Sequence, residues 1–184
     1  MGVLYWNNNT ERYNSHSLVN AGPGKMIDIE IAPDNSFVVM ASNQSFEIFQ
    51  LSGSAFVALG TFWDEGFVLT AIELVLEGKY LVIGGESPSI VCRSAPDLSI
   101  HQTIITGFTS ITDISSGSET GVFAVSGQGL AIIMYYEFLE STKTFNNTYN
   151  VSTPVPLVEK VKLSSKAQHL VIAGNSSFFY LNEC

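Results

Sequence analysis

The sequence has few charged residues, few cysteines and no long apolar run, and each shortage argues against a class of protein. Asp, Glu, Lys and Arg make up 14% of the 184 residues, where about 25% is usual in soluble domains. The 17 acidic and 8 basic residues give a formal charge of −9, which argues against nucleic acid as a partner, because binding it needs clustered Lys and Arg. The longest apolar run, residues 130–136, has the length of a strand. It is far shorter than the roughly 18 residues of a membrane-spanning helix, so no membrane span is predicted.

Cysteine is too scarce for a disulfide-stapled protein. Cys92 and Cys184 allow at most one bridge. Two separate thiols are the simpler interpretation, and a bridge between them or to other sequence is the alternative. No Cys-x-x-Cys pair occurs, and His16, His101 and His169 are far apart in the chain. We therefore predict no metal site and no cofactor.

The two ends of the sequence suggest a longer chain. The N-terminus has no basic region followed by an apolar stretch, so no secretory signal peptide is predicted there. The C-terminus comes almost directly after the apolar residues 178–181, whereas domains usually close with a polar tail. We expect these 184 residues to be a piece of a longer protein.

Four segments of the sequence superimpose as internal repeats. Aligned on Ile29, Ile72, Ile114 and Val161, they recur at spacings of 43, 42 and 47 residues. Each repeat has an alternating apolar segment, a polar turn, an apolar run that ends in small residues, a second turn and another apolar run. Val, Ile, Phe and Tyr in these runs, with Gly, Asn, Ser or Pro between them, indicate strands and not helices.

A fourth short apolar segment follows in the first three repeats, at residues 56–59, 98–100 and 138–139. Four strands in about 43 residues are typical of a β-propeller blade. The predicted fold class is all-β, a β-propeller or partial propeller of about four four-stranded blades in a single domain. The repeats are expected at residues 26–66, 67–108, 109–156 and 157–184, with strands of a flanking blade in residues 2–20. The small residues after the second strand are expected to permit tight turns; they are Ala41, Gly84, Ser126 and Gly174.

The predicted strands do not add up to a closed ring. Residues 3–6 and 13–19 look like a third and a fourth strand, whereas the C-terminus ends after a third strand. Residues 13–19 could close a ring of four blades with the last repeat, but residues 3–6 would then be surplus. We expect a partial propeller that absent sequence or a second chain completes, because exposed strand edges and blade faces favour association.

The third repeat, Gly121-Val-Phe-Ala-Val-Ser-Gly-Gln-Gly-Leu-Ala-Ile-Ile133, resembles the LVIVD-type propeller repeat of cell-surface proteins. The first repeat, with Ala32-Pro-Asp-Asn35 before residues 37–39, resembles the wider class of Ser-Pro-Asp-Gly propeller repeats. The Asp that is common after the third strand of the LVIVD family is missing. WD repeats match less well, because no Gly-His pair occurs and the one Trp-Asp pair, Trp63-Asp64, ends a fourth strand. The resemblance implies a propeller and nothing more specific.

Five Asn-x-Ser/Thr sequons all lie in expected turns; they are Asn8, Asn43, Asn146, Asn150 and Asn175. Asn, Ser and Thr are ordinary turn residues, which is the structural explanation. The functional explanation is N-glycosylation of a secreted protein. Together with the scarcity of Lys, it predicts an extracellular or cell-surface location, with the cytoplasm as the alternative.

Four aromatic residues are difficult to place in a core: Trp6, Trp63, Tyr135 and Tyr136. If exposed, they could stack on a sugar or anchor a protein partner. The remaining aromatic residues fall mostly on strand positions and are expected to pack between blades.

No catalytic motif is present: the sequence has no Gly-x-Ser-x-Gly, no His-Glu-x-x-His and no phosphate-binding Gly-rich loop with Lys. Asp64 and Glu65 beside Gly66 could contribute to a weak cation site, but a solvated turn is the stronger interpretation. Charged residues on the expected inner strands keep a propeller enzyme open as an alternative; they are Asp28, Glu30, Glu73, Asp113, Glu159 and Lys160.

We therefore predict a non-enzymatic structural or protein-interaction propeller module in an extracellular or cell-surface assembly. Its partners would be proteins, or further copies of the chain that complete the propeller, with glycans as additional contacts. One alternative is an intracellular propeller scaffold in a large complex. The other is a fragment of a propeller enzyme, such as a glycosidase or a quinone-dependent dehydrogenase.

Overall fold

A computed structural model describes residues 2–7, 12–18, 23–52, 55–59, 64–117, 119–154, 157–174 and 177–182. All strands within these residues belong to antiparallel sheets in which consecutive strands are neighbours. Three sheets have four strands, one has three and one has two. The prediction of an all-β chain built from four-stranded meanders is confirmed.

The strands have the following bounds. The N-terminal hairpin consists of β1 (Gly2–Asn7) and β2 (Arg12–Leu18). The first sheet consists of β3 (Met26–Ile31), β4 (Phe37–Ser42), β5 (Phe46–Ser52) and β6 (Ala55–Ala58). The second sheet consists of β7 (Leu69–Val75), β8 (Tyr80–Gly85), β9 (Ser89–Ser94) and β10 (Ile100–Ile105). The third consists of β11 (Ser110–Ser116), β12 (Val122–Gln128), β13 (Ile132–Leu139) and β14 (Thr144–Ser152). The fourth consists of β15 (Lys160–Leu163), β16 (His169–Gly174) and β17 (Ser177–Asn182).

The strand register repeats from sheet to sheet. The first and second strands pair through equivalent residues; the pairs are Ile29 with Met40, Ile72 with Ile83, Ile114 with Val125, and Val161 with Ile172. Residues directly opposite each other point to the same face of a sheet. The register therefore assigns each residue an equivalent in the other sheets, and the sequence alignment on these four positions has the correct register.

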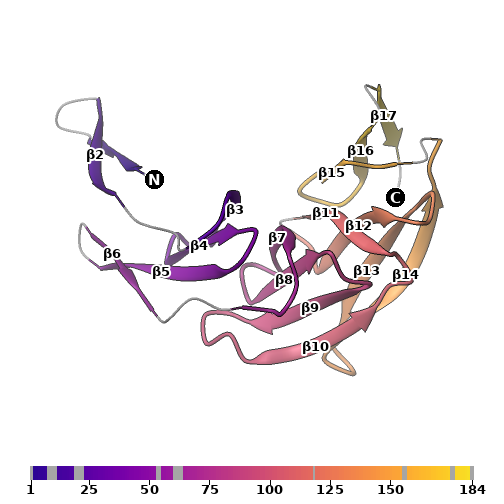
Figure 1. Ribbon diagram of the computed structural model, residues 1–184, viewed down its shortest axis with the longest axis horizontal. Helices are drawn as coiled ribbons and strands as arrows, with labels where there is room; N and C mark the ends of the chain where they lie inside the picture. The colour runs from indigo at the N-terminus through magenta and orange to yellow at the C-terminus, as the bar shows by residue number, and fades with distance from the viewer. Residues whose placement is uncertain are drawn as a thin grey trace.

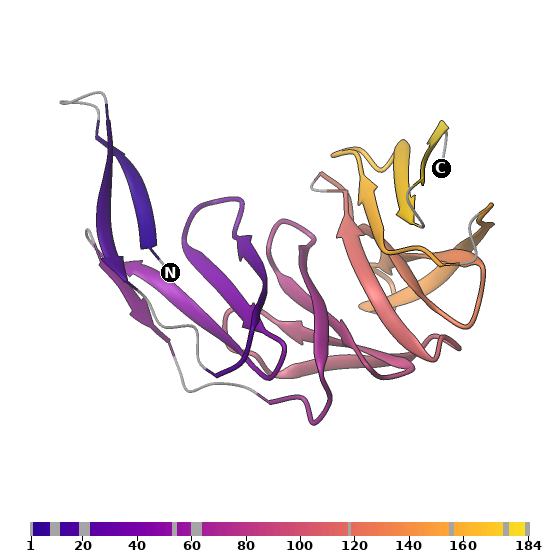
Figure 2. The ribbon, with the colours of Figure 1, turned by 45° about the horizontal axis from the view of Figure 1, so that its top comes forward.

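The sheets are arranged side by side in an open arc (Figures 1 and 2). Their first strands, β3, β7, β11 and β15, contact one another in sequence order and form the inner edge of the arc. This is the arrangement of blades in a propeller. The N-terminal and C-terminal ends lie apart in both views. The hairpin lies next to the first sheet, where β2 contacts β6, so the alternative in which residues 13–19 close a ring of four with the last repeat does not occur in this structure.

A separate apolar core fills each joint between neighbouring sheets. Between the first and second sheets it contains Phe46, Ile48, Ile72, Leu81 and Ile83. Between the second and third it is rich in aromatic residues, among them Phe108, Phe123, Tyr136 and Phe145. Between the third and fourth it contains Ile133, Val161, Leu163, Leu170 and Ile172. Each inner sheet is therefore buried on both faces.

Small residues at the end of the second strand have a different purpose from the one predicted. Neither Gly84 nor Gly174 has a positive φ, so neither is needed for a turn. A Cβ atom at Gly84 would lie 2.6 Å from Cγ2 of Ile111, in the next sheet. One at Gly174 would collide with the carbonyl of Leu157 on the incoming chain. The turn interpretation is wrong for both glycines, because their size permits close approach of neighbouring chain segments.

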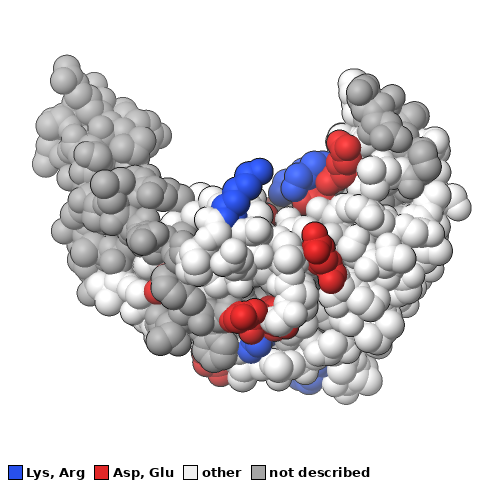
Figure 3. Space-filling view, viewed as in Figure 1, with Lys and Arg blue, Asp and Glu red and all other residues white. Residues whose placement is uncertain are grey.

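The surface agrees with the low content of charged residues. Figure 3 shows that the described part of this face is mostly uncharged, with Lys, Arg, Asp and Glu in scattered positions. Over the residues that the structure describes, no helix has the length and apolarity needed to cross a membrane.

Candidate functional site

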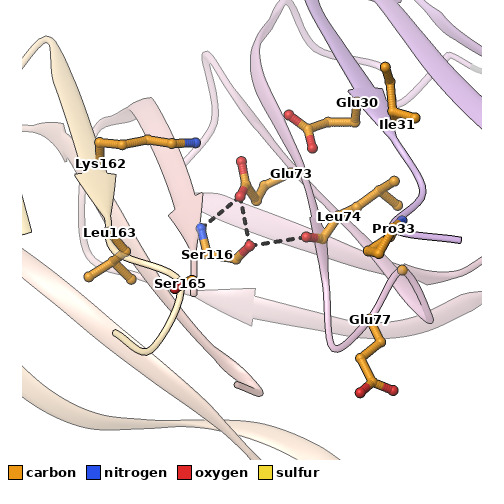
Figure 4. A pocket seen from close by; sticks show the side chains of 11 residues that line it. Glu30, Ile31, Pro33, Glu73, Leu74, Glu77, Ser116, Lys162, Leu163 and Ser165 are labelled. Atoms are coloured by element: carbon orange, nitrogen blue, oxygen red, sulfur yellow. Dashed lines mark hydrogen bonds between the residues drawn. The ribbon is translucent and has the colours of Figure 1, made fainter. Parts of the chain in front are cut away.

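The inner strands of all four sheets line a cavity of about 260 Å³ (Figure 4). Glu30 comes from β3, Glu73 from β7, Ser116 from β11 and Lys162 from β15. The sequence had pointed to the two glutamates through their place on predicted inner strands. It had not pointed to Ser116 or Lys162, because no motif surrounds either residue.

Glu73 joins the second sheet to the third. Its Oε1 accepts hydrogen bonds from the backbone N–H of Ser116 at 2.8 Å and from the Ser116 hydroxyl at 2.7 Å. Burial raises the pKa of Glu73, and the two bonds from Ser116 act in the opposite direction. Ser115 has the same position in the third sheet that Glu73 has in the second. Its hydroxyl oxygen accepts a hydrogen bond from the backbone N–H of Leu163, in the fourth sheet, at 3.2 Å.

Glu30 is the carboxyl group with the most altered acidity in the cavity. Burial, reinforced by the negative charges of Glu73 and Asp28, raises its pKa to about 8. The backbone of Leu74 and the amine of Lys162 oppose this rise. At pH 7 Glu30 is therefore mostly a neutral carboxylic acid, which can donate a hydrogen bond.

Asp113 joins the third sheet to the fourth. Its Oδ1 accepts from the amine of Lys160 at 2.7 Å, and its Oδ2 accepts from the backbone N–H of Val161 at 2.8 Å. Burial raises the pKa of Asp113, while Lys160 and Val161 act to lower it. Of the two remaining acidic candidates, Asp28 on β3 adds negative charge beside Glu30, and Glu159 lines a different cavity with Thr70 and Thr112.

Threonine provides a further link between inner strands. The hydroxyl of Thr70 donates to the carbonyl of Ile111 at 2.7 Å, and that of Thr112 donates to the carbonyl of Val158 at 2.6 Å. The two threonines occupy equivalent positions of successive repeats. The polar residues of the inner strands thus connect the second sheet to the third and the third to the fourth.

The candidate cation site at Asp64 and Glu65 is not formed. Glu65 is buried and pairs with Arg93 through two bonds, of 2.5 Å to Nε and 3.1 Å to Nη2. Asp64 accepts the backbone N–H of Gly66 at 2.7 Å. The solvated-turn interpretation is also wrong for Glu65, because Arg93, distant in sequence, neutralises it in the interior. No group of three or more His, Cys, Asp or Glu side chains suited to a metal ion occurs in the described ranges.

The five sequons have different surroundings. Asn8 and Asn175 lie outside the described residues. Asn43 is half-buried in the turn between β4 and β5, and its Oδ1 accepts the backbone N–H of Lys25 at 2.8 Å. Asn146 and Asn150 are exposed on β14. The turn assignment is wrong for these last two, because the polar insertion pairs with β13 and becomes the outer strand of its sheet.

The aromatic candidates are buried where their side chains are described. Trp63 and the side chain of Trp6, which lies in β1, fall outside the described residues. Tyr135 and Tyr136 are 3% and 2% exposed. They point to opposite faces of β13, and Tyr136 stacks on Phe123 with ring centroids 5.2 Å apart. Their assignment as contact residues is wrong, because both faces of the third sheet are covered.

Cys92 is a free and buried thiol. Burial raises its pKa to about 12, so it carries no thiolate at neutral pH. Cys184 lies outside the described residues. The interpretation of separate thiols agrees with the free thiol of Cys92, and a bridge to other sequence stays an untested alternative.

No family profile and no curated protein sequence matches this chain. Solved structures match its fold. The structure of RRP9 WD40 repeats matches with a TM-score of 0.72 and 12% identity, over 89% of this chain and 52% of that one. The structure of U3-55K matches with a TM-score of 0.70 and 12% identity, over 89% of this chain and 53% of that one. A chain of the mitotic checkpoint complex matches with a TM-score of 0.71 and 11% identity, over 86% of this chain and 51% of that one.

The fold is that of a partial, WD-like β-propeller. At 11–12% identity the likeness extends to the fold alone. The chain spans about half the length of the solved structures it matches. Of the two sequence resemblances, these neighbours support the WD-like one, which the residues favoured less, and give no specific support to the LVIVD type.

Proposed function

We propose that this chain is a non-enzymatic propeller module that binds other proteins. The observation that carries the proposal is a set of exposed apolar side chains on the outer strands. Val57 on β6 is 51% exposed, and Ile100 and Ile105 on β10 are 62% and 72% exposed. Apolar residues on the edge of a rigid sheet form a surface suited to a protein partner. One structural neighbour belongs to a mitotic checkpoint complex, which is itself a protein assembly.

The inner-strand carboxylates support a structural role. Glu73 and Asp113 each accept two hydrogen bonds across a joint between sheets, and a catalytic group would have to give these up to reach a substrate. The alternative of a propeller enzyme, a glycosidase or a quinone-dependent dehydrogenase, rests on Glu30, a protonated carboxyl beside a second carboxylate.

The proposed unit is one propeller segment in residues 1–184. Its repeats are residues 26–66, 67–108, 109–156 and 157–184. Each of the four successive sheets lies within one of these ranges, and the hairpin of a flanking blade precedes them.

The proposed location is extracellular or at the cell surface. Asn146 and Asn150 support it, because both are exposed on an outer strand that a glycosyltransferase can reach. The LVIVD-type resemblance of the third repeat agrees with this location. The intracellular alternative is favoured by the free thiol of Cys92 and by the neighbour from a mitotic checkpoint complex.

Cross-linking in the source cells, followed by reconstitution of the identified protein with the purified chain, tests the proposed function. The double variant Ile100→Asp/Ile105→Asp is expected to weaken binding by about tenfold or more. The matched control Glu30→Gln/Glu73→Gln should bind as the natural chain does. Glycoside hydrolysis or quinone reduction that the control variant loses would overturn the proposal in favour of an enzyme.

A further inference from the structure

The fourth sheet has an exposed face where the equivalent faces of the other sheets are buried. Phe178 on β17 is 79% exposed. Its equivalents by strand register are fully buried at 0%; they are Phe46, Ile90 and Ile133. Each equivalent belongs to the core of a joint with the following sheet. Phe178 therefore occupies a position that faces a joint in the other three sheets, and it is exposed among the described residues.

Val171 on β16 shows the same contrast on the same face. It is 39% exposed, whereas its equivalents Val39, Val82 and Ala124 are 0% exposed. A polar surface residue would be expected at an ordinary solvent-facing position of a strand. Two apolar residues at positions that are otherwise buried mark this as a sheet-packing face.

The opposite end of the arc presents the matching half of such a joint. Ile29 and Ile31 on β3 are 38% and 58% exposed. Their equivalents Ile72 and Leu74 in the second sheet are 0% and 7% exposed, because they pack on Phe46 and its neighbours. The first sheet thus presents, near the inner edge, the side chains that elsewhere cover the position of Phe178.

The two ends also carry opposite charges on their inner strands. Lys160 and Lys162 lie on β15, and Asp28 and Glu30 occupy the equivalent positions of β3. Within the chain, Asp113 and Lys160 occupy this same position on either side of a joint and pair at 2.7 Å. A joint between the two ends would bring the lysines next to the carboxyl groups.

The strand content of the two ends is complementary in one strand and overlaps in another. Among the described residues, the fourth sheet has three strands where the three preceding sheets have four. The hairpin of β1 and β2 lies beside the outer strand β6 and has no inner strands of its own. In a joint between the two ends, β2 could supply the fourth strand, whereas β1 would have to give up its place to β17.

We propose that two copies of this chain join head to tail, the exposed face of the fourth sheet of each on the first sheet of the other. This rests on the proposed protein-binding function and names a second copy as a partner. Each chain spans about half of the solved propellers it matches, and two copies together have about the length of one of them. A closed ring covers all exposed ends, whereas a head-to-tail contact that does not close produces a filament.

Sedimentation equilibrium on the full chain tests the proposal, and the expected mass is twice 20.0 kDa. Phe178→Lys and Ile31→Asp should each give the mass of one chain. Both positions are exposed, so the variants are expected to fold, and a circular dichroism spectrum checks this. An equimolar mixture of the two variants should restore the two-chain species. One joint then has its natural residues, and the other pairs the introduced amine with the introduced carboxylate.

Leu130→Lys is the matched control, because Leu130 is 39% exposed but lies between β12 and β13 of the third sheet, away from both ends. It should remain a two-chain species. A natural chain with the mass of one copy at all concentrations overturns the proposal, as does a Phe178→Lys variant that keeps the two-chain mass. Assemblies of three or more copies also contradict a two-copy ring. In each of these cases the proposed function still stands if binding of the identified protein depends on Ile100 and Ile105.

Discussion

The joint between the second and third sheets differs from the joint between the third and fourth in what fills it. The first contains a group of aromatic rings, in which Phe123 stacks on Tyr136 at 5.2 Å and meets Phe145 edge-on at 5.3 Å. The second is filled mainly by aliphatic side chains such as Leu170 and Ile172. The threonine links at the inner edge are the same in both. Backbone register therefore determines where polar links form, while the apolar filling varies with the space available.

The two joints also differ in how they hold a buried carboxyl group. Glu73 accepts both of its bonds from the neutral donors of Ser116. Asp113 accepts one bond from a backbone N–H and the other from the cation of Lys160. Glu73 follows and Asp113 precedes the equivalent residues Ile72 and Ile114, so a buried carboxyl group can bridge a joint from either of two positions of the repeat.

The largest loss of stability should come from removing an aromatic ring from the joint between the second and third sheets. Phe123→Ala is expected to lower the free energy of unfolding by about 3–5 kcal/mol, because Phe123 is fully buried and leaves a large cavity. Leu170→Ala in the aliphatic joint should cost about 2–3 kcal/mol. Urea denaturation measures both losses. Ile105→Ala is the control: Ile105 is exposed, so its free energy of unfolding should stay within about 0.5 kcal/mol of that of the natural chain. A larger loss for Leu170→Ala would contradict the comparison.

Smaller losses in the free energy of unfolding are expected when the hydrogen bonds of the two buried carboxyl groups, Asp113 and Glu73, are removed. Asp113→Ala leaves the N–H of Val161 and the amine of Lys160 without their acceptor, which should cost about 1–3 kcal/mol. Ser116→Ala removes only a hydroxyl and leaves the backbone bond to Glu73 intact, so about 1 kcal/mol is expected. The same denaturation experiment compares them, and equal losses would show that the cation adds nothing.

The cavity should make stability depend on pH. The folded chain holds a proton on Glu30 up to a pKa of about 8, whereas the ordinary value is 4.5. Between these values the folded state binds more protons than the unfolded state, so stability should fall as pH rises from about 5 to about 8. The raised pKa values of Glu73 and Asp113 act in the same direction.

Midpoints of urea denaturation at a series of pH values measure this fall. Glu30→Gln should reduce the slope. Glu140→Gln should not, because Glu140 is exposed and its ion pair with Lys143 lowers its pKa, away from this range. Stability that increases from pH 5 to pH 8 would contradict the assignment of a protonated Glu30.

The smallest effect on stability is expected at the sequons. Asn146→Gln and Asn150→Gln should change stability by less than about 0.5 kcal/mol, because both residues are exposed on an outer strand. Asn43→Gln should cost about 0.5–1.5 kcal/mol through its bond to Lys25. Intact mass before and after deglycosylation, against 20.0 kDa for the polypeptide, detects glycans. A single 20.0 kDa species from the native source would favour the intracellular alternative.

The fold was far more predictable from the sequence than the candidate site. The repeat spacing and the alignment on Ile29, Ile72, Ile114 and Val161 placed the inner strands in the correct register. Glu30 and Glu73 were placed on inner strands for the same reason. Ser116 and Lys162 were missed, because they meet the glutamates only after sheets from distant parts of the chain come together.

By itself, the sequence determined the strands, their order and their repetition, because apolar alternation and turn residues act within a few positions of each other. Only the tertiary structure decided what each side chain meets. Tyr135 and Tyr136 are adjacent in the chain but are buried in different joints, and Glu65 is neutralised by Arg93. Phe178 resembles its equivalents in sequence but differs from them in exposure. The contacts that make these differences join residues that are distant in the sequence, and no local pattern specifies them.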